Sequence, residues 1–306
     1  MVSIDGVSIS KTKLTTLDGI WSCHTRRFNE ETHIVDLKYR GDEDLVALRL
    51  LVDYARDRGG TNLMLRVAYL PYSSSTDDGN IFAVRSIINM INDMHFTDVE
   101  VYEPLDYNMA KMLNNVRIKY YTAKLVKEAM MNILDLRGSA WLDKKIGFRA
   151  EETDFSYQAL LRKAKENNIY LVYLDNQSYV KYTKQLEYKE NVLVCQQTFD
   201  KEGGIIGYTL DRYKYTSEYD GGKAIIAHNL CDNSEFITEI AKQLTNMGFI
   251  DIRLVAPHCT EQFLASDIFN SELLKQVYTT TSLADIETTN EYHSYNIENT
   301  KMTVYS

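Results

Sequence analysis

Three absences narrow the class of this 306-residue chain. No apolar run approaches the roughly 20 residues that a membrane-spanning helix requires, and the chain opens on a polar stretch, so we expect a cytosolic protein. Lys/Arg-rich runs are missing and the formal net charge is −9, which disfavours nucleic acid as a partner. The cysteines lack CxxC or zinc-type spacing, so we interpret them as reduced and mostly buried: Cys23, Cys195, Cys231 and Cys259.

The composition and the hydrophobic pattern are those of a two-domain α/β protein. With 44% hydrophobic and 25% charged residues, the chain is long enough for two compact cores. From residue 62 onward, short β-branched runs alternate with helical patterns, which indicates parallel sheets flanked by helices. We predict domains over 1–150 and 151–290 with a boundary near 145–155, and we leave the polar tail over 291–306 unassigned.

The same pattern predicts individual elements. In the first half, we expect strands over 63–70 and 99–102, with a helix over 81–94 between them. In the second half, the predicted elements are strands over 169–173, 192–195, 223–227, 252–256 and 277–280, and helices near 178–188, 234–247 and 261–275.

All three prolines follow predicted strands. Pro71, Pro104 and Pro257 each stand where a strand ends, because proline cannot donate a hydrogen bond to a sheet. Ligands of open parallel sheets bind at the carboxyl ends of the strands, so these corners are the first places to search for a site. The alternative is that the prolines only mark turns.

Six segments carry a resemblance to a known family. They are LPY at 70–72, VYEPLDYN at 101–108, YLDNQSYVK at 173–181, CQQTFDKEGGIIGY at 195–208, HNLCDNSEFITEIAKQL at 228–244 and VYTTTSL at 277–283. In this order they resemble the motifs of ribose-phosphate pyrophosphokinases (PRPP synthetases), and especially the divergent members carried by large bacteriophages. The resemblance runs from Phe28 to Leu283, and the segment at 228–244 aligns to its motif without a gap.

The resemblance implies a fold, a reaction and partners. It implies two phosphoribosyltransferase-like domains, each a mainly parallel sheet flanked by helices. The family reaction is the Mg²⁺-dependent transfer of diphosphate from the substrate ATP to ribose 5-phosphate, or to ADP-ribose, in nucleotide or NAD precursor metabolism. The expected partners are nucleotides or ribose phosphates and further subunits, either copies of the chain or an active homologue. A phage-encoded member would work in the host cytoplasm.

The two corners of the first half lack the family's ligand-binding groups. The arginines that hold ATP would fall within Ser73–Asp78, where none stands. Asp77 and Asp78 are either new metal ligands or part of a solvated turn. The metal-binding histidine is replaced by Leu105, so at this corner a magnesium ion would need oxygens from Asp106, the candidate metal ligand, or from Glu103.

The pyrophosphate loop keeps part of its chemistry. By resemblance, Asp175 binds substrate and metal, and Ser178 and Lys181 are further substrate-binding candidates. Small residues of the motif are replaced by Asn176 and Gln177, and a side chain at a glycine position obstructs the approach of a diphosphate to the backbone amides.

The flexible loop has lost its catalytic cations. Glutamines at 196–197 and Phe199 occupy the positions of the family's lysine and arginine. Lys201 and Arg212 lie nearby in the sequence and are candidate catalytic replacements. The alternative is that both are solvated side chains beside a hairpin.

The ribose-phosphate loop is the most informative of these segments, because it differs from the family motif at the positions that bind the ligand. The substrate-binding candidates are Asp232, Asn233 and Ser234. In the family motif, three glycines expose backbone amides to the 5-phosphate, and in this chain residues 233–235 replace them. Asn or Ser followed by Glu is also an ordinary helix start, and Glu235 would repel a phosphate. His258, near a histidine of the family, is a candidate acid or base together with His228, or else a structural histidine.

Two hypotheses follow from these substitutions. Either the chain is a diphosphotransferase with a rebuilt site, or it is a catalytically silent relative that serves as a regulatory or structural subunit or as a nucleotide-binding protein. Loss of cations and glycines at every loop favours silence, because no single replacement restores so many transition-state contacts.

Overall fold

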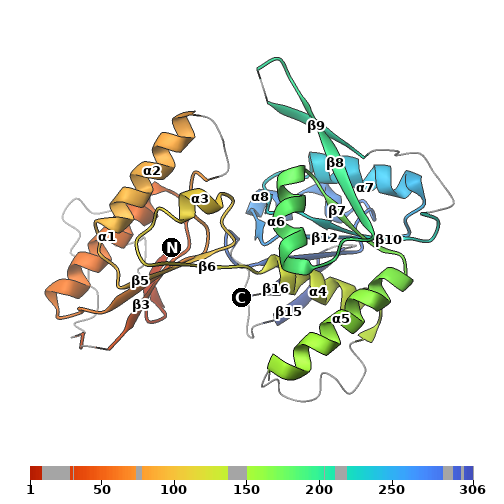
Figure 1. Cartoon of the computed structure of the whole chain (residues 1–306). Helices are drawn as coiled ribbons and strands as arrows, with labels where there is room; N and C mark the ends of the chain where they lie inside the picture. Colours follow the sequence, from red (N-terminus) through yellow and green to blue (C-terminus); the bar gives the residue numbers. More distant parts are fainter. Residues whose placement is uncertain are drawn as a thin grey trace. The chain divides into compact units, whose positions relative to one another are not determined.

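The structure is a computed structural model that describes residues 1–8, 28–29, 31–73, 78–136, 150–202, 204–210, 219–284, 292–297 and 300–305. The chain forms two compact units, Met1–Tyr120 and Tyr121–Ser306 (Figure 1). The predicted boundary near 145–155 lies later in the chain than this division. The intervening helix α4 (Thr122–Ile133) contributes side chains to the core of unit 2, which is why it groups with that unit.

Unit 1 is built on a six-stranded sheet with the order β2-β1-β3-β4-β5-β6. Strands β3 to β6 are parallel, and β1 runs antiparallel to β2 and β3. The strands are β1 (Val2–Ile4), β2 (Val7–Ser8), β3 (His33–Leu37), β4 (Leu63–Val67), β5 (Asp98–Tyr102) and β6 (Val116–Lys119), and the described helices are α1 (Asp42–Asp57), α2 (Asp78–Asn92) and α3 (Tyr107–Ala110).

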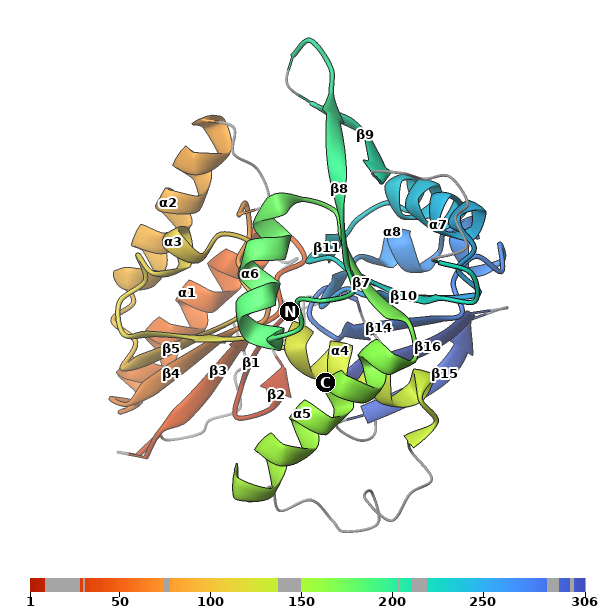
Figure 2. The same cartoon turned by 45° about the vertical axis from the view of Figure 1, so that its right-hand side comes forward.

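One face of this sheet packs on all three described helices. Alternate strand residues such as Leu37, Leu65 and Val101 are fully buried against apolar residues of α1, α2 and α3 in one core cluster. The three helices accordingly lie on one side of the strands (Figure 2). Helix α1 begins with Asp42, Glu43 and Asp44, where carboxylates are favoured by the helix dipole.

Unit 2 is built on an eight-stranded sheet with the order β15-β16-β14-β12-β10-β7-β8-β9. Its central strands are parallel, and β9 and β15 are antiparallel to their neighbours. The strands are β7 (Ile169–Tyr173), β8 (Val192–Phe199), β9 (Ile205–Leu210), β10 (Lys223–Ala227), β12 (Asp251–Val255), β14 (Gln276–Thr280), β15 (Tyr292–Ile297) and β16 (Thr300–Tyr305).

Helices cover both faces of this second sheet. One face packs on α7 (Glu235–Met247), α8 (Glu261–Leu264) and the 3₁₀ turn Asp267–Phe269. The other packs on α4, α5 (Ala150–Glu166) and α6 (Asn176–Leu186). Burial of both faces explains why strands such as β10 and β12 are apolar along most of their length. Across the described residues, no helix combines the length and apolar character that a bilayer crossing requires.

The predicted fold class, α/β with mainly parallel sheets, is confirmed. The strands predicted over 169–173 and 223–227 coincide with β7 and β10. The strand predicted over 63–70 ends earlier, at Val67, and the helix predicted over 261–275 is reduced to α8 and a 3₁₀ turn. The tail that was left unassigned supplies β15 and β16, and β16 pairs in parallel with β14.

A charged network is buried in the sheet of unit 2. The Arg253 guanidinium donates to both carboxylate oxygens of Asp251, at 2.9 and 3.0 Å, and also to Gln276 at 3.1 Å and to the Tyr278 hydroxyl at 2.9 Å. Lys275 Nζ lies 3.1 Å from Asp251 Oδ2. Burial raises the pKa of Asp251, but Arg253 and Lys275 outweigh this effect and hold it below its ordinary value.

Replacement of Asp251 by alanine is expected to destabilise the protein by about 3–5 kcal/mol, because it leaves the Arg253 charge buried without its partner. The free energy of unfolding in urea measures the effect. Asp53→Ala, which breaks the exposed Arg49–Asp53 ion pair on α1, is the matched control, with an expected cost below about 0.5 kcal/mol. Equal losses in the two variants would contradict this assignment.

The same carboxylate gives a pH dependence. Because the folded pKa of Asp251 is depressed, its contribution to stability is present above the unfolded pKa and is lost as the pH falls through the folded value. Urea unfolding at a series of acidic pH values should therefore bring the wild type and Asp251→Ala together. A difference that stays constant down to the lowest pH would contradict the charge-based explanation.

Candidate functional site

The candidate site lies at the carboxyl ends of three adjacent strands of unit 2. Strands β7, β10 and β12 are neighbours in the sheet and run parallel, so the loops that follow them start at the same edge. The loops after β7 and β10, together with helix α6 that follows β7, carry the predicted substrate-binding residues. The same edge of an open parallel sheet is where ligands usually bind.

Asp175 caps helix α6. Its Oδ1 accepts a hydrogen bond from the Ser178 amide at 2.6 Å, and its Oδ2 accepts one from the Ser178 hydroxyl at 3.1 Å. An aspartate at this position satisfies an amide that would otherwise lack an acceptor within the helix. Two of the predicted substrate-binding residues therefore contact each other, and the amide that a diphosphate could use is already bonded.

Two amides of the loop between β10 and α7 are bonded by side chains of the same loop. The Asn233 amide donates to its neighbour, Asp232 Oδ1, at 2.8 Å, and the Glu235 amide donates to Asn233 Oδ1 at 3.2 Å. Ser234 is the residue before α7 but makes no capping bond through its side chain. The helix-start interpretation of this loop is the one the geometry favours, with Asn233 rather than Ser234 as the side chain that bonds the helix amide.

A short two-stranded pairing holds this loop against the next one. Strand β11 (Leu230–Cys231) pairs in parallel with β13 (His258–Cys259), which places Cys231 opposite Cys259. Both cysteines are buried and free, as predicted. Thr260 adds a hydrogen bond from its hydroxyl to the Asp232 carbonyl at 3.2 Å.

His228 and Asn229 follow β10 and keep unused hydrogen-bonding atoms. Among the described residues, His228 Nδ1 and Asn229 Oδ1 are buried atoms without a hydrogen-bond partner. Burial lowers the pKa of His228 below its ordinary value, although the carboxylates of Asp175 and Asp232 oppose this effect. The imidazole is therefore neutral at pH 7 and can accept or donate a hydrogen bond.

Carboxylates dominate the charge around this edge. Burial, with added repulsion from Asp175 and Glu239, raises the pKa of Cys195 to about 12. Burial also raises the pKa of Tyr208, helped by Asp175 and Asp232 among others.

His258 is buried and bonded rather than open to a ligand. Its Nδ1 lies 2.7 Å from the Ser282 hydroxyl, and both side chains are buried. The Ser282 hydroxyl also lies within 3.2 Å of the Pro257 carbonyl oxygen. The structure therefore gives this histidine the contacts of the structural alternative.

The predicted flexible loop is a projecting β-hairpin. Strands β8 and β9 extend from the body of unit 2 (Figure 1). Lys201 lies in the turn between them and is exposed. At its base, Gln243 of α7 donates to the Tyr208 carbonyl at 3.0 Å and accepts from the Leu210 amide at 2.9 Å, so one side chain bonds the edge of β9. Lys181 lies on α6 with its ammonium 5.0 Å from the centre of the Tyr182 ring. Arg212 lies outside the described residues.

Asp106, the metal candidate of unit 1, also serves as a helix cap. Its Oδ1 accepts from the amides of Asn108 at 2.7 Å and Met109 at 3.1 Å. Asp77 lies outside the described residues, as does the side chain of Asp78. Within the described parts of the chain, no three His, Cys, Asp or Glu side chains gather as a metal site would require.

Comparison with known proteins supports the fold. No protein-family model matches the chain, and no curated protein does. The chain is similar to the crystal structure of phosphoribosylpyrophosphate synthetase from Mycobacterium smegmatis, with a TM-score of 0.59 and 11% identity over 91% of this chain and 78% of that chain. A purine phosphoribosyltransferase from Pyrococcus horikoshii matches with a TM-score of 0.23 and 10% identity, over 51% of this chain and 89% of that one. The first likeness establishes a two-domain phosphoribosyltransferase-like fold.

Sequence reasoning missed two features of the site. The amide hydrogen bonds of Gln243 to β9 have no sequence signal, because a glutamine on a helix surface is ordinary. The unpartnered atoms of His228 and Asn229 could be suspected from two polar side chains directly after an apolar strand, but their burial depends on tertiary packing.

His228 is expected to titrate below the ordinary histidine pKa, because burial disfavours the imidazolium. Proton NMR across a pH series measures its ring resonances, and His228→Gln identifies them. Titration at or above the value of a free histidine would show that Asp175 and Asp232 outweigh burial and would contradict a neutral ring at pH 7.

Proposed function

We propose that this chain is a homologue of ribose-phosphate pyrophosphokinases that no longer transfers diphosphate from ATP and that acts as a binding subunit, structural or regulatory, in nucleotide or NAD precursor metabolism. The proposal rests on the likeness in fold and on the loops at the carboxyl edge of unit 2. It assigns the chain a ligand-binding or partner-binding role in place of catalysis.

One observation carries the proposal: the chain's own side chains accept the hydrogen bonds of the loop amides. A phosphate group held at a helix N-terminus needs free amides and no competing negative charge. Here the amides of Ser178, Asn233 and Glu235 donate to Asp175, Asp232 and Asn233 respectively. A bound phosphate would have to displace two carboxylates, and its charge would meet that of Glu235.

The chemistry of diphosphate transfer supports the same conclusion. Charge spreads over the phosphate oxygens as the bond breaks, and enzymes stabilise it with cations placed in advance. On the described hairpin, glutamines and Phe199 occupy the expected positions, and Phe199 is 53% exposed. Lys201 is the cation of the described turn, and it is exposed to solvent, where its charge is screened.

The purified protein, incubated with ATP, Mg²⁺ and either ribose 5-phosphate or ADP-ribose, is expected to release no more AMP than a reaction without protein. Chromatography of the nucleotides measures AMP, and an active PRPP synthetase serves as the positive control. The proposal is wrong if AMP forms only when both substrates are present and Asp175→Ala abolishes it while Asp53→Ala, on the exposed face of α1, does not.

Opening the ribose-phosphate loop should strengthen phosphate binding. The double variant Asn233→Gly/Glu235→Gly frees one amide and removes one negative charge, so ribose 5-phosphate is expected to bind about tenfold more tightly than to the wild type. Isothermal titration calorimetry measures the change. Glu261→Gly, which removes a carboxylate from the first turn of α8, should leave the affinity unchanged. Equal affinities for the wild type and the double variant would show that the side chains do not block the loop.

A further inference from the structure

A buried histidine of unit 1 has an oxygen atom opposite each of its ring nitrogens. His33 is the first residue of β3, and its side chain is 5% exposed. Its Nδ1 lies 2.9 Å from Asp5 Oδ2, and its Nε2 lies 3.1 Å from Asn29 Oδ1. Because both nitrogens are bonded, the protons on the ring can be assigned from these contacts.

The Asn29 atom that faces the ring is an acceptor. The Glu31 backbone amide also donates to Asn29 Oδ1, at 3.1 Å. If the side-chain amide of Asn29 were rotated, its NH₂ group would face the N–H of Glu31, so this contact fixes the orientation of Asn29. An acceptor opposite Nε2 of His33 requires a proton on Nε2.

The Asp5 carboxylate requires a proton on the other nitrogen. Its Oδ1 accepts from the Ile34 amide at 2.9 Å, and its Oδ2 faces Nδ1 of His33. The proton between Oδ2 and Nδ1 belongs to the ring, because the ordinary pKa of histidine, about 6.5, is higher than that of aspartic acid, about 3.9. A neutral imidazole carries one N–H and this site requires two, so the hydrogen bonds describe an imidazolium.

The Asp5 side chain ties a turn to the sheet. Asp5 and Gly6 form the two-residue loop of the β1–β2 hairpin, with positive φ angles of 47° and 78°. The Asp5 amide also donates to the Ile34 carbonyl at 2.8 Å. The turn is therefore bonded to the start of β3 through the backbone of Ile34 and the ring of His33.

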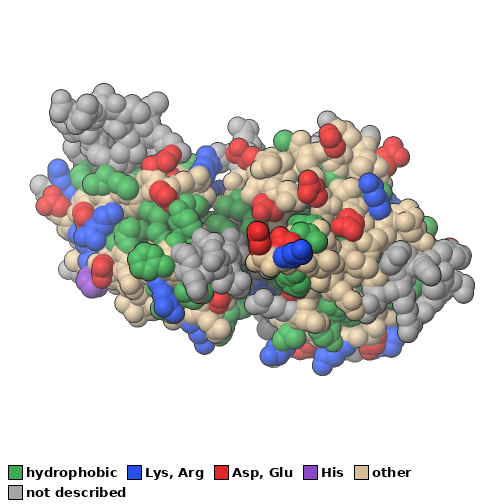
Figure 3. All heavy atoms as spheres, turned by 90° about the horizontal axis from the view of Figure 1, so that it is seen from above, with side chains coloured by type: hydrophobic (Ala, Val, Ile, Leu, Met, Phe, Trp, Pro, Cys, Tyr) green, Lys and Arg blue, Asp and Glu red, His purple; other side chains and the backbone are tan. Residues whose placement is uncertain are grey.

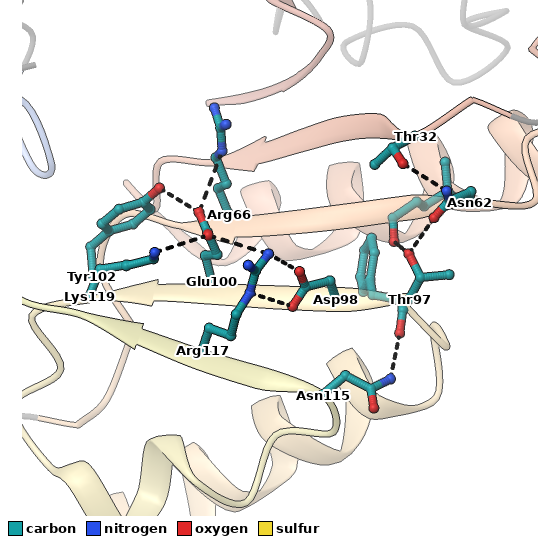
Figure 4. Close-up of polar contacts among 12 residues, drawn as sticks. Thr32, Asn62, Arg66, Thr97, Asp98, Glu100, Tyr102, Asn115, Arg117 and Lys119 are labelled. Atoms are coloured by element: carbon teal, nitrogen blue, oxygen red, sulfur yellow. Dashed lines mark hydrogen bonds and ion pairs between the residues drawn. The ribbon is translucent and has the colours of Figure 1, made fainter. Parts of the chain in front are cut away.

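The start of β3 is held on its other side as well. The His33 amide donates to the Asn62 carbonyl at 2.9 Å. The Asn62 side chain bonds the hydroxyls of Thr32 and Thr97, at 2.7 Å each (Figure 4). The Phe28 ring packs edge-on against the imidazole, with 5.0 Å between the ring centres. These contacts fix the position of the His33 ring relative to its two oxygen partners.

One charged side chain contacts the ring within the described parts of the chain, and it is that of Asp5. Glu31, Asp36 and Arg58 are the charged residues of the adjoining described segments, and the two hydrogen bonds of the ring go to other residues. The site therefore pairs one imidazolium with one carboxylate.

We propose that His33 is an imidazolium that latches two segments, the Asp5–Gly6 turn and Asn29, to the start of β3. A ring that loses one proton can donate to only one of the two oxygens, and its lone pair then faces the other. Because the ring is buried, water does not replace the lost contact. A rise in pH that removes this proton therefore releases either the turn or Asn29, which makes the contact a pH-sensitive latch within unit 1.

Nuclear magnetic resonance of the full chain with ¹⁵N-labelled histidine tests the charge state, because protonated and unprotonated ring nitrogens differ in chemical shift. At about pH 8, where an ordinary histidine is neutral, His33 is expected to show two protonated nitrogens. Asp5→Asn is expected to remove the proton from Nδ1, since the NH₂ group of the asparagine then donates to this nitrogen. His33→Gln identifies the resonances.

An exposed histidine provides the control. His95 is exposed, and its ring resonances should be the same in the wild type and in Asp5→Asn. The chain has six histidines, and histidine covers little of the face drawn in Figure 3, so the set of ring resonances to be assigned is small.

The latch itself is tested by the two amides that share its acceptors. As the pH rises and the ring loses its second proton, the amide resonance of Ile34 should shift if the turn is released, and that of Glu31 should shift if Asn29 is released. The shift is expected to have the same midpoint as the ring. In Asp5→Asn, where the ring is already neutral, no linked shift is expected.

Circular dichroism shows whether Asp5→Asn folds, and the wild-type spectra decide the matter if it does not. A neutral His33 ring in the wild type at about pH 8 would overturn the proposal. So would a ring that loses its proton while the amides of Ile34 and Glu31 stay unchanged. The outcome does not depend on the proposed function, because the latch lies in unit 1 and the loops that carry that function lie in unit 2.

Discussion

Backbone amides at the ends of parallel strands need hydrogen-bond acceptors, and the identity of the acceptor determines what the second unit can do. In this chain Asp175, Asp232 and Asn233 supply the acceptors. The bond from the Ser178 amide to Asp175 lies at the start of α6, and the bond from the Glu235 amide to Asn233 lies at the start of α7. Since an amide N–H has one hydrogen to donate, an amide that donates to a side chain of its own loop cannot also bind a phosphate. In the proposed function, the stability of the loops and the loss of the phosphate site are two results of one set of hydrogen bonds.

The fold depends on residues other than these loop side chains. The cores of unit 2 consist of apolar side chains on both faces of the sheet, and Asp175, Asp232 and Asn233 do not belong to them. A likeness to a PRPP synthetase structure therefore persists at 11% identity. Unit 1 differs from unit 2 in the second face of its sheet. Its second sheet face carries charges where unit 2 carries apolar residues, so the same plan of strands presents a covered face in one unit and a polar face in the other.

Strands buried on both faces were the most predictable part of the structure. Ile169–Tyr173 and Lys223–Ala227 are short, mostly apolar runs rich in β-branched or aromatic residues, so their limits follow from local pattern. The capping role of Asn233 was also predictable, because Asn followed closely by Glu is a helix-start signal. The tail was not: β16 is a strand because it pairs with β14, and its polar sequence has no apolar period. Nor could the sequence show that Arg253 meets Gln276 and Tyr278 inside the sheet, which depends on the register of β12 with β14.

The central claim, that side chains of the protein already occupy the phosphate-binding amides, is tested most directly by NMR. The amide resonances of Asn233 and Glu235 can be followed in ¹⁵N-labelled protein as ribose 5-phosphate is added. The account predicts that neither resonance moves, because both amides keep their intramolecular acceptors. Large, saturable shifts of both resonances in the wild-type protein would show that the loop opens to a phosphate, and would contradict it.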